Sequence, residues 1–116
     1  MGDRANVYVT DGANPGVFLY SHWGGTKFQR HAVEILAQPT VRVRWGDAPY
    51  LTRILFGRLV DDHKGTTGYG ISTRMPDNEH PVLVINTKAL RWYFVDEGEH
   101  DGPVPPTALP FGELVP

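Results

Sequence analysis

Runs of apolar residues along the first quarter of the chain predict two strands. Residues 5–10 and 17–23 are rich in β-branched and aromatic side chains, which is typical of strands. The segment DGANPG between them is dense in turn-forming residues, so the pair is predicted to form a β-hairpin. In 17–23 large apolar side chains alternate onto both faces. This pattern is typical of a strand that is central in its sheet or covered on both sides.

Two segments with helical periodicity follow. The first spans 27–38, with Thr26 as its expected N-cap, and the second spans 48–62 after Asp47 as its N-cap. Gly57 inside the second helix costs about 1 kcal/mol against Ala, which suggests close backbone packing there. The apolar stripes are formed by Phe28, Ala32, Ile35 and Leu36 in the first helix and by Leu51, Ile54, Leu55 and Leu59 in the second.

Three further strands are predicted at 69–74, 81–86 and 90–95, the last two as a hairpin. The element order β-β-α-α-β-β-β favours an α+β fold, a mainly antiparallel sheet with two helices on one face. Residues 1–96 are expected to form this single domain. Since two helices cover only one face of a sheet whose strands are apolar on both, the sequence also predicts a homodimer.

Composition removes several classes of protein. The 116 residues are enough for one domain with its own core. Without any Cys, disulfide scaffolds, thiolate zinc sites, iron–sulfur clusters and cysteine nucleophiles are excluded. A net charge of −2 provides no bulk attraction to nucleic acid or to an anionic membrane, and no apolar run approaches the ~20 residues needed to cross a bilayer.

The C-terminal segment 97–116 differs from the rest of the chain. Half of the 10 prolines lie in the last 14 residues, and after Arg91 the chain has five acidic and no basic residues. Proline fixes φ and lacks an N–H, so we expect an extended arm rather than a helix or a central strand. Val104, Leu109 and Phe111 would let this arm dock on the domain or contact a partner.

A glycine-rich segment precedes the strand predicted at 69–74. Successive glycine amides can form an anion-binding nest, to which a neighbouring lysine adds charge. Both Walker and dinucleotide signatures need a strand before the glycines and a helix after them, and here the order is reversed. A flexible connector is the other interpretation. The candidate residues are Lys64, Gly65, Thr66, Thr67, Gly68 and Tyr69.

The end of the second strand supplies further candidates. Trp23, followed by Gly24 and Gly25, makes an edge on which a flat ligand could stack, and Arg4 could grip a phosphate or carboxylate with its planar fork. His22 points to the opposite face from its neighbour Ser21, so the two cannot form a nucleophile–base pair. The alternatives are a packed strand end for Trp23 and an exposed ion pair between Asp3 and Arg4.

Two other patterns are weaker. The alternation in 41–45 puts Arg42 and Arg44 on one side, which with Arg53 and Arg58 would make a modest basic surface. A solvated linker is the preferred interpretation, and nucleic acid is not favoured as a partner. The five histidines have no metal-ligand spacing, so we predict neither a metal nor a cofactor.

Three segments resemble a group of small, uncharacterised proteins encoded by actinobacteria and their phages: GDRANVYV (2–9), LYSHWGG (19–25) and GTTGYGIS (65–72). The resemblance covers about residues 2–95. It implies a cytoplasmic protein linked to a phage or another mobile element. The group has no established activity, so no catalytic residue is transferred. Small phage proteins of this kind often bind a host factor or a signal molecule, which favours binding over catalysis.

The leading hypothesis is therefore a non-catalytic binding protein for a small anionic or nucleotide-like ligand, or for a host protein. Its site would lie where Arg4 and residues 22–25 approach residues 64–69. One alternative is a small hydrolase or transferase with His22 as general base, oriented by Asp3 or Asp47. Another is an inhibitor of a host nucleic-acid-binding factor, whose acidic segment 96–101 mimics phosphates.

Overall fold

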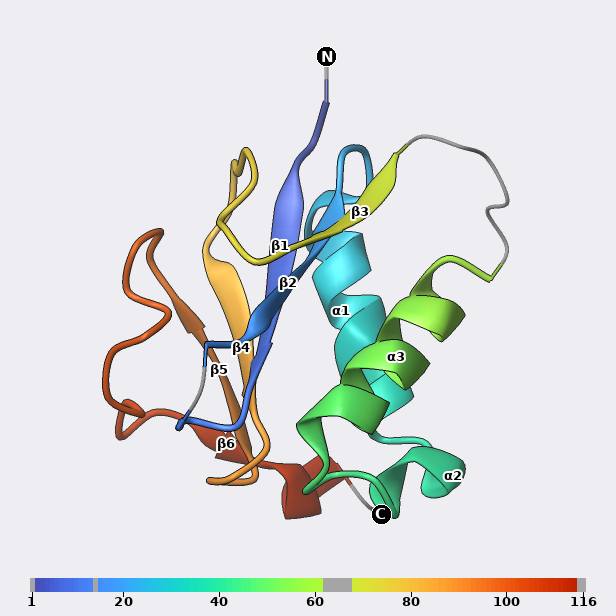
Figure 1. Cartoon of the computed structure of the whole chain (residues 1–116), viewed down its shortest axis with the longest axis vertical. Helices are drawn as coiled ribbons and strands as arrows, with labels where there is room; N and C mark the ends of the chain where they lie inside the picture. Colours follow the sequence, from blue (N-terminus) through green and yellow to red (C-terminus); the bar gives the residue numbers. More distant parts are fainter. Residues whose placement is uncertain (1, 14, 62–67, 115–116) are drawn as a thin grey trace.

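The computed structural model describes residues 2–13, 15–61 and 68–114, and it has the predicted α+β architecture. Six strands form one mixed sheet, with the main helices on one face (Figure 1). The strands are β1 (Ala5–Thr10), β2 (Val17–Ser21), β3 (Tyr69–Ser72), β4 (Val82–Asn86), β5 (Arg91–Val95) and β6 (Leu109–Pro110). The helices are α1 (Gly25–Leu36), α2 (Pro39–Arg42), α3 (Ala48–Leu59) and the 3₁₀ helix η1 (Phe111–Leu114).

The strand order is β3-β2-β1-β4-β5-β6. All neighbours are antiparallel except the central pair, because β1 and β4 run parallel with Thr10 opposite Asn86 at their last pair. The sheet is thus mainly antiparallel, as predicted. The parallel pair brings the carboxyl ends of two strands to the same edge of the sheet.

The core between the helices and the sheet is built from the predicted apolar stripes. Leu36 of α1 and Leu55 of α3 are fully buried there against the β1 residue Val7. Asp47 caps α3 as expected, since its Oδ1 accepts from the Tyr50 amide at 3.4 Å. Two expectations were wrong: α1 is capped at Gly24 instead of Thr26, and a Cβ on Gly57 would meet nothing within 4 Å.

The segment 41–45 does not alternate as the sequence suggested. Residues 39–42 form α2, so Val41 is fully buried while Val43 is 81% exposed. The Arg42 side chain turns back to donate to the Ala37 carbonyl oxygen at 3.1 and 3.2 Å. Arg44 lies over the Tyr50 ring at 4.4 Å. These arginines are thus held by the chain's own groups, and they do not line one basic face.

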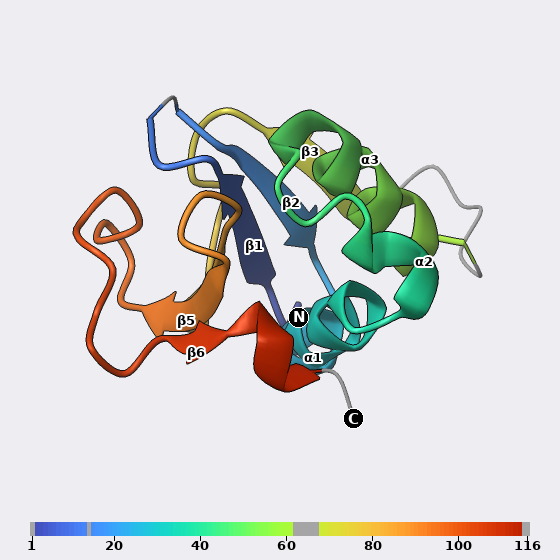
Figure 2. The same ribbon diagram turned by 90° about the horizontal axis from the view of Figure 1, so that it is seen from below.

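The opposite face of the sheet is covered by the same chain. A second core there contains Tyr8, Phe18 and Val84 from the strands together with Ala108 from the C-terminal segment. Figures 1 and 2 show residues 96–108 passing across this face, away from the helices. The chain therefore supplies its own cover for both faces. The reason for predicting a homodimer is removed, and the oligomeric state stays a prediction.

The proline-rich segment ends inside the fold. Leu109–Pro110 adds the short edge strand β6 to β5, and the Phe111 amide donates to the Leu90 carbonyl oxygen at 2.9 Å. Phe111 is fully buried in the core on the helix side, with its ring 5.4 Å from that of Trp45. The docking interpretation of this segment is thus the one observed. Within the described ranges, no helix combines the length and apolar character that a membrane crossing requires.

Alkaline pH is expected to destabilise the protein through Tyr8. Burial, together with the Asp101 carboxylate that accepts from its hydroxyl at 2.8 Å, raises the pKa of Tyr8 above the ordinary 10.0. In the unfolded chain the phenol titrates at its ordinary value. The stabilisation is therefore complete below about pH 10 and is lost as pH rises through the folded-state pKa.

Urea denaturation of wild type and Tyr8→Phe at several pH values between 8 and about 11.5 tests this expectation. The free energy of unfolding should fall less steeply above pH 10 in Tyr8→Phe, whereas Tyr50→Phe, at a half-exposed position, should keep the wild-type slope. Equal slopes in Tyr8→Phe and wild type would contradict the role given to Tyr8.

Candidate functional site

The N-terminal residues and the end of β2 are joined by backbone hydrogen bonds. The Asp3 amide donates to the His22 carbonyl oxygen, and the Gly25 amide donates to the Asp3 carbonyl oxygen, both at 2.8 Å. The His22 amide in turn donates to the Gly68 carbonyl oxygen at 2.8 Å. Residues 3, 22–25 and 68 are therefore held together at this edge of the sheet.

The glycine pair in this region is required for packing. A Cβ on Gly24 would lie 2.7 Å from the Ser21 Oγ and 2.9 Å from the Phe28 Cβ. Gly25 has φ +53°, and a Cβ there would lie 2.0 Å from a carboxylate oxygen of Asp3. The Asp3 carboxylate thus occupies the start of α1, where negative charge is favourable. Both glycines are explained without a ligand.

Trp23 is not explained in that way, because it is 60% exposed. Its indole is nevertheless held in place. The His22 ring packs edge-on against it with centroids 4.2 Å apart, and a Cβ on Gly68 would already lie 3.3 Å from the indole Cδ1. Tryptophan is enriched at binding surfaces, so an exposed indole that packs on His22 marks a candidate site.

Beside Trp23 lies a cavity of about 220 Å³, which we call the Trp23 cavity. Phe28 and Leu59, both buried, belong to its lining. Two basic residues of α1, one turn apart, stand at the cavity with exposed side chains. The residues that line it are Trp23, Gly24, Lys27, Phe28, His31, Leu59 and Tyr69. The cavity therefore combines aromatic rings with positive charge.

Lys27 and His31 were not among the predicted site residues, although their spacing in the sequence is informative. Residues four apart on a helix lie on one face, and both follow the WGG segment within two turns. Of the predicted residues, Trp23, Gly24 and Tyr69 line the cavity, and Gly68 packs against Trp23. Lys64, Gly65, Thr66 and Thr67 lie outside the described residues.

Arg4 lies elsewhere. It lines a separate groove of about 660 Å³ with Met75 and Asn78, on the face of the sheet opposite the helices. Its amide donates to a carboxylate oxygen of Glu79 at 3.0 Å, and its guanidinium lies 3.7 Å from the same oxygen. The expectation that Arg4 and Trp23 share one pocket was wrong. Successive side chains along a strand point to opposite faces of the sheet, and these two residues fall on opposite faces.

The arrangement proposed for a His22 general base is not formed. The His22 Nδ1 lies 3.0 Å from the Tyr20 hydroxyl, and neither candidate carboxylate contacts the ring. Asp3 is in contact with His80, and Asp47 caps α3. Within the described ranges, no group of three or more His, Asp or Glu side chains is arranged to hold a metal ion.

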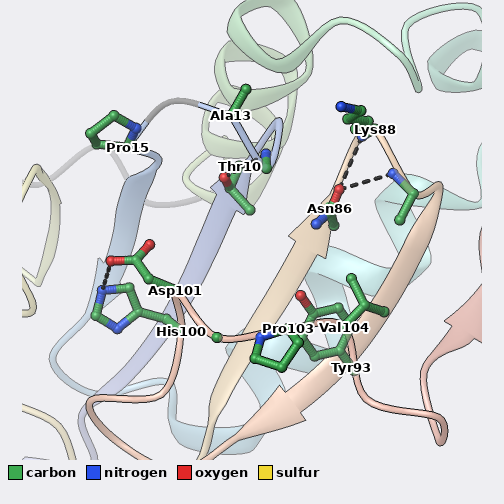
Figure 3. Close-up of a pocket in the computed structure, with 13 residues that line it drawn as sticks. Thr10, Ala13, Pro15, Asn86, Lys88, Tyr93, His100, Asp101, Pro103 and Val104 are labelled. Carbon is green, nitrogen blue, oxygen red and sulfur yellow. Dashed lines mark hydrogen bonds and ion pairs between the residues drawn. The ribbon is translucent and has the colours of Figure 1, made fainter.

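A second and larger concave surface lies at the other end of β1, where the sequence predicted no site. It has a volume of about 740 Å³ and lies at the carboxyl ends of the parallel strands β1 and β4 (Figure 3). We call it the β1–β4 groove. Residues 100–104 of the C-terminal segment form one side of it.

Comparison with known proteins adds no relative. No family model matches the chain, and neither does any curated protein or any solved structure. The resemblance to actinobacterial and phage proteins therefore stays a prediction. Functional inference for this chain depends on its own geometry and chemistry.

Proposed function

We propose that the protein is a binding protein for a small anionic ligand with a planar ring, of the mononucleotide type, held in the Trp23 cavity. The observation that carries the proposal is the fixed, exposed indole of Trp23 beside Lys27 and His31. Planar rings stack on exposed indoles, and such stacking is worth roughly 1–3 kcal/mol per base in proteins that bind single strands.

The charge of the ligand follows from the lining of the cavity. Among the described residues that line it, Lys27 and His31 are the ionisable side chains of α1, and none is a carboxylate. A cavity of about 220 Å³ holds a single ring system, so the sugar and phosphate would lie across the rim beside these two residues. A host protein remains the alternative occupant of this surface.

Binding of adenosine 5′-monophosphate, adenosine and inorganic phosphate, each by isothermal titration calorimetry, tests the proposal. Trp23→Leu should weaken the binding of adenosine 5′-monophosphate at least tenfold, because the stacking surface is removed. Lys27→Gln should weaken the binding of the nucleotide and leave the affinity for adenosine unchanged. The matched control is Arg53→Gln, which removes one positive charge from an exposed position of α3 outside the cavity.

Two outcomes would contradict the proposal: an affinity for the nucleotide that Trp23→Leu leaves unchanged, or no detectable binding at millimolar concentration. Trp23→Phe retains an aromatic ring and should keep most of the affinity, which separates loss of stacking from loss of folding. Binding of a single-stranded oligonucleotide in preference to the mononucleotide would assign the surface to nucleic acid instead.

A further inference from the structure

The β1–β4 groove lies where ligands bind in sheets with parallel strands, outside the carboxyl ends of those strands. Its floor begins at the last pair of the two strands, Thr10 and Asn86. Both side chains belong to the face of the sheet opposite the helices, on which the C-terminal segment lies. The groove is therefore bounded by the sheet, by two turns and by residues 100–104.

The two turns at the groove are held rigid by side-chain oxygens. The Gly12 amide donates to the Thr10 Oγ1 at 3.0 Å, and the Ala13 amide donates to a carboxylate oxygen of Asp11 at 2.9 Å. After β4, the amides of Lys88 and Ala89 both donate to the Asn86 Oδ1, at 3.1 and 2.9 Å (Figure 3). These four amides are thus already used, so we look to side chains for contacts to a ligand.

Tyr93 supplies a donor. It is only 5% exposed, and it belongs to the lining of the groove. Burial raises the pKa of Tyr93, so the hydroxyl keeps its proton at neutral pH. The protonated phenol is therefore a hydrogen-bond donor in the lining of the groove.

Opposite charges stand on the two sides of the groove. Figure 3 places Lys88 on one side and Asp101 on the other. Asp101 is positioned by the Tyr8 hydroxyl at 2.8 Å and by the His100 Nε2 at 3.3 Å, and its side chain is still 74% exposed. The His100 ring is itself packed against Tyr8 and Phe18, with centroids 4.7 and 4.9 Å away. The acidic end of the groove is therefore anchored to the sheet through Tyr8 and His100.

The apolar part of the lining is formed by Ala13, Pro15, Ala89, Pro103 and Val104. We propose that the β1–β4 groove binds a small zwitterion with an apolar side chain, an amino acid or a dipeptide. Its carboxylate accepts from Lys88 and the Tyr93 hydroxyl, its ammonium pairs with Asp101, and its side chain packs on the two prolines. This site is independent of the Trp23 cavity and shares no lining residue with it.

Charge removal on both ligand and protein tests the proposal. The probes are L-leucine, its dipeptide L-leucyl-L-leucine, N-acetyl-L-leucine without the ammonium, and L-leucinamide without the carboxylate, each titrated by calorimetry. We expect N-acetyl-L-leucine and L-leucinamide to bind at least tenfold more weakly than L-leucine, because each leaves one charged group of the groove unpaired. The dipeptide shows whether the groove prefers the longer zwitterion.

Variants then assign each charge to its partner. Lys88→Gln should reduce the difference in affinity between L-leucine and L-leucinamide to the part that the Tyr93 hydroxyl provides. Asp101→Asn should remove the difference in affinity between L-leucine and N-acetyl-L-leucine. Asp101→Asn keeps an oxygen that accepts from Tyr8, so the fold is preserved. Tyr93→Phe retains the buried ring and should weaken the binding of L-leucine about tenfold. Arg53→Gln is the control and should leave the affinity for L-leucine unchanged.

Equal affinities for all probes would overturn the proposal, because they would indicate an apolar cleft without charge recognition. Absence of binding at millimolar concentration would overturn it as well. Failure of the nucleotide to bind in the Trp23 cavity would leave this inference intact. Conversely, failure of L-leucine to bind in the groove would leave the proposed function intact. The two tests are separate, because Lys27 lines the Trp23 cavity and Lys88 lines the β1–β4 groove.

Discussion

Replacing Phe111 by Ala is expected to lower the free energy of unfolding by about 4 kcal/mol, since truncation of a buried Phe costs roughly 3–5 kcal/mol. The side chain is fully buried between the helix layer and the sheet, and its ring packs edge-on against Trp45 at 5.4 Å. Urea denaturation followed by circular dichroism measures the loss. Since domains are stable by roughly 5–15 kcal/mol, one substitution in the C-terminal segment would remove a large part of the stability.

Leu109→Ala is the matched control, two residues away on β6. Leu109 is 43% exposed, so its truncation should cost less than about 1 kcal/mol. If Phe111→Ala were no more destabilising than Leu109→Ala, the C-terminal segment would be an appendage of the domain and not a part of its core.

The burial of Phe111 also decides how the acidic-tail hypothesis must be tested. Deletion of residues 97–116 would remove Phe111 from one core and Ala108 from the other, so any loss of activity would follow from unfolding. Substitution of the exposed acids Asp96, Glu97 and Glu99 by their amides removes the charge and leaves the fold. An inhibitor that mimics phosphates would lose its activity in this variant.

Local periodicity was enough to predict most elements and the α+β class, but not how distant strands pair. The apolar stripe of α1 and the hairpin of β1 and β2 are formed by residues close in sequence. The insertion of β4 beside β1 joins residues more than 70 positions apart, and no local pattern records it. The alternation in 41–45 was too short to separate a strand from a helical turn.

The candidate site was predicted only in part, because it too depends on how distant strands pair. Trp23 and Tyr69 meet because β2 and β3 are neighbours in the sheet, with Ser21 opposite Tyr69. Arg4 was placed with them only by its position at a strand end. Alternation back from Val7, which belongs to the core on the helix side, puts Arg4 on the other face. The β1–β4 groove could not be predicted, because it needs both the parallel pairing and the docked C-terminal segment.

The glycine at the start of α1 gives the second large effect. Gly25→Ala is expected to lower the free energy of unfolding by about 2 kcal/mol, because an L residue at a φ of +53° is strained by roughly 1–2 kcal/mol and its Cβ would displace the Asp3 carboxylate. The same substitution at Gly57 of α3 meets open space and should raise stability by about 1 kcal/mol through helix propensity. Denaturant titration measures the change in the free energy of unfolding, which should be a loss for Gly25→Ala and a gain for Gly57→Ala.

A double variant separates the two causes at Gly25. With Asp3→Ala in the background, the Cβ has room, so Gly25→Ala should then cost only the backbone strain of about 1 kcal/mol. If Gly25→Ala lowers the free energy of unfolding equally in both backgrounds, the whole loss comes from backbone strain. If it lowers the free energy of unfolding in neither background, the packing described for this edge is contradicted. Because both glycines of the WGG segment are accounted for by packing, Trp23 is the member of that segment for which the fold itself provides no reason. The ligand experiment is therefore best aimed at its indole.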